Sequence, residues 1–302
     1  MKIIDHILSS RPEPTATESL EAWWRLHQQW AHFALPIDRA MAGGFAADRP
    51  AHAFASGFHE TLVQVVGLPS RVATAFCATE GGGAHPRAIQ TTLSPAGGGL
   101  RLQGHKTFTT LGTFARDLLV VAKRGVRDGR PDLVVARINA DRAGVSREAL
   151  PPLPIIPEIP HAELRFDAVV VGPEEVLEGD GYLRYLKPMR TVEDCHVLAA
   201  VVSWLVQVAR RSRWPTSLVE DLVVTLTALR TIASLDPLAP STHAVLEGVL
   251  RQVKALVGAA EPQWAQVDPP TADRWLRDRA LVDVAATARA RRAEAAWQRL
   301  GA

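Results

Sequence analysis

The sequence contains little cysteine, little net charge and no long apolar run, and each shortage excludes a class of protein. Only Cys77 and Cys195 occur in 302 residues, so we expect no disulfide framework and a reducing, cytoplasmic environment. The formal net charge of +2 gives no reason to expect a nucleic acid or an anionic membrane as a partner. No segment approaches the run of about 18 apolar residues that a membrane span needs, so we expect no membrane-spanning helix.

Several motifs with a defined chemistry are also missing. No Gly-x-Gly-x-x-Gly or Walker-type loop is present, and no Gly-x-Ser-x-Gly turn offers a nucleophilic serine. The 10 histidines show no metal-ligand spacing, and two distant cysteines do not make a zinc site. The sequence therefore predicts neither a metal centre nor serine hydrolysis.

The remaining composition, 47% hydrophobic and 22% charged, is that of an ordinary globular protein. The length is sufficient for two or three packed units. The hydrophobic pattern divides the chain into helical residues 1–71, short strands over residues 72–180, and helical residues 181–302. We therefore expect an α+β protein with N-terminal helices, a middle β-domain and a C-terminal helical bundle.

The last two regions contain clear breaks. A strand–turn–strand pattern covers residues 88–103, and short strands are predicted at residues 118–122, 133–138 and 162–166. This pattern indicates a compact β-domain rather than alternating strands and helices. The C-terminal region predicts a four-helix bundle, from runs at Thr191–Arg213, Ser217–Leu235, Ser241–Ala260 and Thr271–Leu300.

Two motifs flank the predicted hairpin. The first reads Phe76-Cys77-Ala78-Thr79-Glu80-Gly81-Gly82-Gly83, and the second reads Gly104-His105-Lys106-Thr107-Phe108-Thr109-Thr110. Together they resemble the middle domain of the acyl-CoA dehydrogenase family of flavoproteins. The order of helices, β-domain and bundle is also similar to that family, although both ends look shorter.

This resemblance implies an FAD site. It assigns cofactor contacts to Phe76, Ala78, Thr79, Phe108, Thr110 and Arg211. Glycines would let the backbone approach the ligand closely. The family's glycine-rich stretch, however, falls on Gln263–Pro270, which has no glycine, so FAD binding is an open expectation.

The resemblance also implies a glutamate base that removes the α-proton of an acyl thioester. The two positions at which the family places it fall on Ala286 and Met189, so both are empty. Asp283 and Glu193 are candidates for a displaced base. Alternatively, both acids are solvated or start a helix.

Two further residues would contact the substrate. His85 stands where the family has a functional serine, and it is a candidate base or substrate contact. Alternatively, His85 is simply an exposed loop residue without a role in binding or catalysis. Arg190 matches an arginine that the family places near the substrate.

Three functional hypotheses follow. The first is FAD-dependent α,β-oxidation of a CoA-bound or carrier-bound acyl thioester by a homodimer or homotetramer. The second is a non-catalytic relative, a pseudoenzyme without flavin or base, that serves as a binding or scaffolding subunit. The third is a different chemistry that uses His85 or Asp283.

Overall fold

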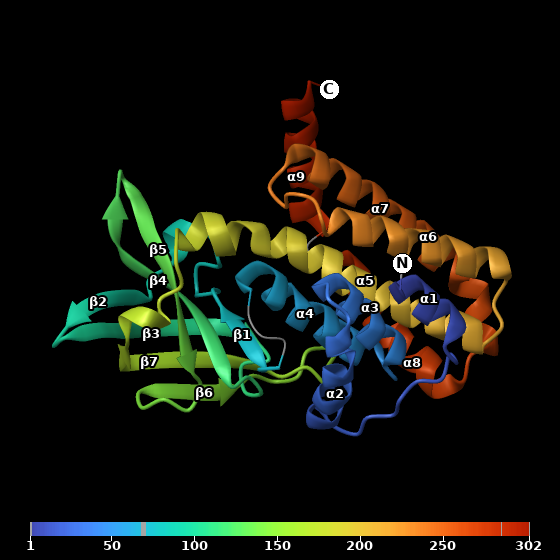
Figure 1. Cartoon of the computed structure of the whole chain (residues 1–302), viewed down its shortest axis with the longest axis horizontal. Helices are drawn as coiled ribbons and strands as arrows, with labels where there is room; N and C mark the ends of the chain where they lie inside the picture. The colour runs from blue at the N-terminus through green and yellow to red at the C-terminus, as the bar shows by residue number, and fades with distance from the viewer. Residues whose placement is uncertain (1, 68–70, 285, 302) are drawn as a thin grey trace. The chain divides into compact units, whose positions relative to one another are not determined.

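The computed structural model describes residues 2–67, 71–284 and 286–301. These residues form one β-sheet and a set of α-helices (Figure 1). The chain divides into two compact units. The helical unit comprises Met1–Gln64, Pro154–Ile156 and Arg190–Ala302, and the sheet unit comprises Val65–Leu153 and Pro157–Met189. The expectation of three domains, with boundaries near residues 72 and 181, stays a prediction.

The sheet unit is built on seven strands. They are β1 (Thr74–Cys77), β2 (Thr92–Ala96), β3 (Gly99–Thr110), β4 (Asp117–Arg127), β5 (Arg130–Asn139), β6 (Val145–Ala149) and β7 (His161–Val171). The strand order is β1-β4-β2-β3-β7-β6, and β5 pairs with β4. All these strands belong to one sheet, and they fall within the predicted β-region of residues 72–180.

The hairpin between β2 and β3 has a tight turn. Gly97 and Gly98 connect the strands with φ of 51° and 85°, a conformation that favours glycine. Leu93 then pairs with Leu102 across the two strands, and both side chains are buried. The predicted hairpin is therefore present with its turn at these glycines, but its first strand begins at Thr92 rather than at residue 88, because Ala88 lies in the short turn η2 (Pro86–Ala88).

The helical unit contains the remaining long elements. They are α1 (Lys2–Ser9), α2 (Leu20–His27), α3 (Pro36–Ala46), α4 (Pro50–Val66), α5 (Lys187–Arg211), α6 (Thr216–Ile232), α7 (Pro240–Ala260), α8 (Pro269–Asp278) and α9 (Ala286–Leu300). Side-chain caps mark some of their starts: Ser19 accepts from the backbone N–H of Ala22 at α2, and Asp268 accepts from that of Thr271 at α8.

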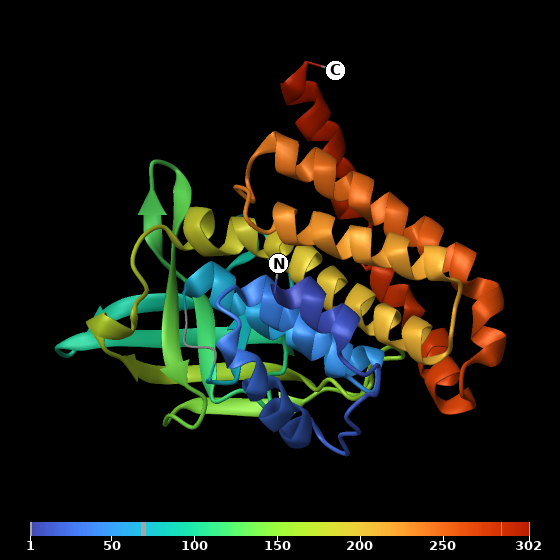
Figure 2. The same cartoon turned by 45° about the vertical axis from the view of Figure 1, so that its right-hand side comes forward.

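Helix α5 lies at the centre of the helical unit, with α3 and α4 close beside it (Figure 2). A Cβ on Gly44 of α3 would lie 2.1 Å from the carbonyl oxygen of Ala200, and one on Gly57 of α4 would lie 2.5 Å from Cα of Val197. These glycines therefore allow the close approach. The segment Gly181–Arg211 is long and apolar enough to span a membrane, yet 89% of its most apolar window is buried in the structure. That burial is typical of a core helix.

The fourth predicted helical run, Thr271–Leu300, is divided in the structure. Helix α8 ends at Asp278, the short 3₁₀ turn η6 (Arg279–Asp283) follows, and α9 begins at Ala286. The buried carboxylate of Asp278 accepts the backbone N–H of Ile156 at 2.8 Å. Arg289 of α9 donates to the carbonyl oxygens of Val282 and Val284. The bonds from Arg289 satisfy carbonyl groups that a continuous helix would pair internally, and the bond from Ile156 fixes the end of α8.

Candidate functional site

The first sequence motif is held by a buried ion pair. Nζ of Lys106 on β3 lies 2.7 Å from Oε1 of Glu80, which also accepts from Oγ1 of Thr91 at 2.7 Å. Burial alone would raise the pKa of Glu80, but Lys106 and the backbone N–H of Gln90 hold it below its usual range. Glu80 is therefore an ionised structural group that fixes the glycine turn beside β3.

Two threonines of the motifs have free hydroxyls. Thr79 and Thr110 are half-buried, and within residues 2–67, 71–284 and 286–301 neither hydroxyl has a hydrogen-bond partner. The carbonyl oxygen of Thr79 accepts from the backbone N–H of Thr107 at 3.0 Å, which fixes Thr79 beside β3. Both hydroxyls can therefore serve a ligand. The side chains of Phe76 and Ala78, in contrast, are buried, and the carbonyl oxygen of Ala78 accepts from Nζ of Lys106 at 3.5 Å.

Phe108 presents an aromatic face. The register of β3 against β7 shifts between Lys106 and Thr109, and such an irregularity re-aims the side chains around it. Phe108 is 39% exposed, and its ring stacks on that of His161 with 4.4 Å between centroids and 28° between planes. Burial lowers the pKa of His161, which keeps its imidazole neutral. The stacked rings of Phe108 and His161 present a planar aromatic surface on the sheet unit.

A cavity of about 50 Å³ lies within the helical unit. It is lined by Phe54 of α4, by Arg190, Glu193, Asp194, Val197, Leu198 and Val201 of α5, by Leu250 of α7, and by Leu281, Val282, Val284 and Arg289. Most of these side chains are apolar, and the charged ones come from α5 and α9. The cavity therefore combines a low-polarity wall with two carboxylates.

The two carboxylates have different environments. The side chain of Glu193 is 17% exposed, and its Oε2 lies 3.4 Å from Nη1 of Arg190. Burial raises the pKa of Glu193, and Arg190 opposes that effect only in part. The neighbouring Asp194 is bound by two arginines, with Nη2 of Arg292 at 2.6 Å and Nη1 of Arg289 at 3.4 Å. Burial raises the pKa of Asp194 as well, but its two oxygens are already bound by these arginines, so Glu193 is the more available proton acceptor.

Three other predicted site residues lie elsewhere. His85 is exposed, and its Nδ1 accepts from the backbone N–H of Arg87, which caps the short turn η2 (Pro86–Ala88). Asp283 is exposed and pairs with Nζ of Lys254 at 2.5 Å. Neither residue lines the cavity.

Arg211 is held by the start of α8. Its Nη2 lies 2.9 Å from Oδ2 of Asp268 and 3.1 Å from Oγ1 of Thr271. A phosphate at Arg211 would have to share or replace these contacts.

Two clusters were not predicted from the sequence. One joins Asp194 to Arg289 and Arg292, and the other joins His27, His59 and Glu60. Each combines residues from distant helices, so no local spacing reveals it. The only sequence signal is the adjacency of His59 and Glu60 on α4.

The comparisons with known proteins agree with the sheet and its motifs. Residues 75–169 match the family model described as the acyl-CoA dehydrogenase, middle domain. The chain carries an acyl-CoA dehydrogenase middle domain. This match, together with the shared fold of the helical regions, supports the resemblance to a diverged acyl-CoA dehydrogenase. No curated protein matches the chain.

Solved structures with the acyl-CoA dehydrogenase-like fold cover nearly all of the chain. The prolyl acyl carrier protein oxidase AnaB is 16% identical, with a TM-score of 0.65, over 93% of this chain and 92% of that chain. Apo-form PigA is 14% identical, with a TM-score of 0.65, over 99% of this chain and 96% of that chain. Butyryl-CoA dehydrogenase from Megasphaera elsdenii is 14% identical, with a TM-score of 0.67, over 98% and 96%. Identities this low show the shared fold.

The segment expected to match the family's glycine-rich stretch is packed by aromatic side chains. Gln263–Pro270, the segment that the resemblance aligns with the family's glycine-rich stretch, overlaps the end of the 3₁₀ turn η5 (Glu261–Gln266) and the start of α8. Trp264 in this turn stacks on Trp275 with 5.4 Å between centroids, and Trp204 and Trp214 complete the cluster. The segment packs into the core of the helical unit and does not fit a phosphate-binding glycine loop.

Proposed function

We propose that this acyl-CoA dehydrogenase-like chain binds FAD and oxidises a short acyl thioester at its α- and β-carbons, with Glu193 as the base. One observation carries the proposal: the carboxylate of Glu193 lines a largely apolar cavity, and burial raises its pKa. Catalytic carboxylates need such a shift, because a base with a higher pKa accepts a carbon-bound proton more readily. Glu193 lies one helical turn after Met189, a family base position that lacks a carboxylate.

Arg190 and Glu193 have different roles in the proposed reaction. Arg190 lies on the Oε2 side of the carboxylate and stabilises the charged base before the reaction. Glu193 then takes the proton from the α-carbon. Bound FAD supplies the acceptor for the hydride that leaves the β-carbon.

The volume of the cavity limits the size of the acyl group that it can hold. One water molecule needs about 10–15 Å³ of such space. A volume of about 50 Å³ therefore has room for only a few non-hydrogen atoms. We propose a short acyl group on this basis.

The sheet unit supplies residues that fit a flavin ring. The exposed face of Phe108 suits stacking, and the free hydroxyls of Thr79 and Thr110 suit the polar rim of the ring. Gln263–Pro270 does not fit the pyrophosphate. The phosphates would therefore be bound by other groups, including those of a second subunit in a homodimer or homotetramer.

The fold relatives support this class of substrate. One is named as an oxidase of a prolyl acyl carrier protein and another as a butyryl-CoA dehydrogenase, and PigA has been solved with FAD and proline. We therefore propose an acyl group carried by CoA or by a carrier protein.

A second function is favoured by the loss of family residues. The family's base positions hold Met189 and Ala286, and Trp264 occupies the former glycine stretch with core packing. A non-catalytic subunit that retains the fold to bind or scaffold a partner would need neither base nor flavin.

The visible spectrum of the purified chain, after addition of excess FAD and removal of the unbound fraction, tests the proposal first. A retained flavin band supports the oxidoreductase, and its absence supports the non-catalytic subunit. Flavin reduction by short acyl-CoA and carrier-bound acyl thioesters is then compared in wild type, Glu193→Gln and the control Glu220→Gln, which alters an exposed acid. We expect Glu193→Gln alone to slow reduction, by about 10²–10⁴-fold. Equal rates in all three proteins would show that Glu193 is not the base.

A further inference from the structure

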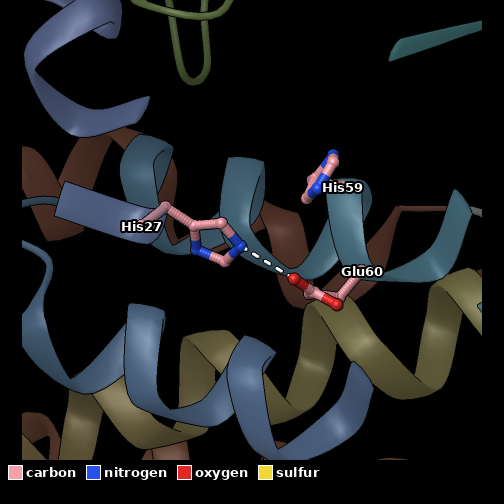
Figure 3. A group of neighbouring side chains, drawn as sticks. All are labelled: His27, His59 and Glu60. Carbon is pink, nitrogen blue, oxygen red and sulfur yellow. Dashed lines mark hydrogen bonds and ion pairs between the residues drawn. The ribbon is translucent and has the colours of Figure 1, made fainter. Parts of the chain in front are cut away.

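Three potential metal ligands meet between α2 and α4. His27 comes from the end of α2, and His59 and Glu60 come from consecutive positions of α4 (Figure 3). Each offers one donor atom, and these atoms all lie within 4.8 Å of one another. The three residues are only 2%, 2% and 0% exposed. The cluster lies within the helical unit and does not involve the cavity around Glu193.

One oxygen of Glu60 is already held by an arginine. Nε and Nη2 of Arg39 donate to Oε2 of Glu60 at 2.8 and 2.7 Å. Nη1 of Arg39 donates to the carbonyl oxygens of Phe33 and Ala34, so the guanidinium is fixed. The other oxygen, Oε1, is directed at His27. A carboxylate that is oriented by a hydrogen-bonded neighbour is the arrangement found around bound metals.

The separation of one ligand pair is near the value that zinc requires. Tetrahedral Zn²⁺ with bonds of about 2.0–2.1 Å separates its ligand atoms by about 3.3 Å. Nε2 of His27 and Oε1 of Glu60 lie 3.0 Å apart, so this pair needs almost no movement. The remaining separations, at most 4.8 Å, would close by side-chain rotation.

We propose that His27, His59 and Glu60 bind a single Zn²⁺-class ion that ties α2 to α4. Two imidazoles and one carboxylate form a ligand set typical of zinc. Because Arg39 neutralises the charge of Glu60, the attraction rests on the imidazole nitrogens. Mg²⁺ and Ca²⁺, which prefer oxygen ligands, therefore fit poorly.

The second ring nitrogen of His27, Nδ1, lies near the hydroxyl of Ser56. A Cβ on Gly43 would lie 2.7 Å from Nδ1 of His27 and 2.6 Å from Oγ of Ser56, so both atoms border the same small space. Nδ1 of His27 has no partner among the residues that the structure describes. When Nε2 binds a metal, Nδ1 carries the proton, and its N–H would need a small shift to donate to Oγ of Ser56, which already accepts from Nε1 of Trp23.

A further imidazole from α5 is prepared as a ligand. Nδ1 of His196 donates to the carbonyl oxygen of Val192 at 2.9 Å, which leaves a lone pair on Nε2. That Nε2 is buried without a partner in the described part of the chain, and the charge of Glu60 acts on the ring. Water is the expected fourth ligand, with the imidazole of His196 as the alternative.

Refolding of the full chain tests the site. The protein is unfolded in denaturant with a chelator and refolded with Zn²⁺, Co²⁺ or Mg²⁺, because a closed site fills as the helices pack. We expect about one Zn²⁺ per chain after gel filtration, visible ligand-field absorption with Co²⁺, and no retained Mg²⁺. His59→Gln should lose the bound ion, whereas the control His32→Gln, at an exposed histidine, should keep it.

The wild-type measurement decides the question even if a variant fails to fold. Refolded wild type with less than about a tenth of a Zn²⁺ per chain would overturn the proposal. Equal zinc content in soluble His59→Gln and wild type would also overturn it. Neither readout depends on FAD or on turnover.

Discussion

The ammonium of Lys106 lies 2.7 Å from the carboxylate of Glu80, and the two side chains are 0% and 7% exposed. This contact joins the two sequence motifs that carry the family resemblance. Both residues therefore act in folding. The groups left to face a cofactor are the neighbouring Thr79, Phe108 and Thr110.

Breaking this pair from one side should destabilise the chain strongly. Lys106→Met leaves Glu80 buried without its cation, and such a loss costs about 3–5 kcal/mol. The double variant Lys106→Met/Glu80→Gln should recover part of that cost, because no uncompensated charge remains. Denaturant unfolding of the single and double variants measures both effects. A single variant within about 0.5 kcal/mol of wild type would contradict the assigned role.

Phe108→Ala should weaken flavin binding with little effect on stability. The ring is 39% exposed, so its removal costs little buried area, but a stacked aromatic contact is worth about 0.5–1.5 kcal/mol. We expect FAD affinity to fall by about 2–10-fold in a titration followed by flavin absorbance. Val170→Ala, at an exposed position of β7, serves as the control and should bind FAD as wild type does.

The pH dependence of turnover should report the base. Because the pKa of Glu193 is raised, its carboxylate is deprotonated only at higher pH than an ordinary glutamate. The rate of flavin reduction should therefore rise with pH through a midpoint above 4.5, the usual value for Glu. Glu193→Gln should remove this step from the profile. A midpoint that persists in the variant would assign the step to another group.

The sequence predicts the sheet and its hairpin because the signals are local: alternating apolar residues and the Gly97–Gly98 turn lie within a few residues of each other. It does not predict the division of the last helix. The residues from Arg279 to Ala286 are compatible with a helix, but the buried contacts of Asp278 and Arg289 outweigh that propensity.

The candidate site is also only partly predictable from the sequence, because its contacts join residues that are distant in the chain. Glu193 is found as a candidate only through its spacing from the family's base position. Its burial depends on residues of α4, α7 and η6, which are distant in the sequence. The pairing of Asp194 with Arg292 also spans nearly a hundred residues, so no local pattern reveals it.

Neutral substitution of the two adjacent acids should have opposite effects on stability. A raised pKa means that folded Glu193 holds its proton more tightly than the unfolded chain does. Its contribution to stability is thus complete at pH below 4.5 and is lost as the pH rises through the folded-state pKa. Glu193→Gln should therefore match or exceed the stability of wild type at pH 7. Burial raises the pKa of Asp194 too, so the difference between the two acids lies in their ion pairs: Asp194→Asn leaves the buried Arg289 without its partner and should cost about 1–3 kcal/mol. Denaturant unfolding of both variants at pH 4 and pH 7 measures the sign of each change in stability. Destabilisation by Glu193→Gln at pH 7 would show that Glu193 is a structural ion-pair partner rather than a base with a raised pKa.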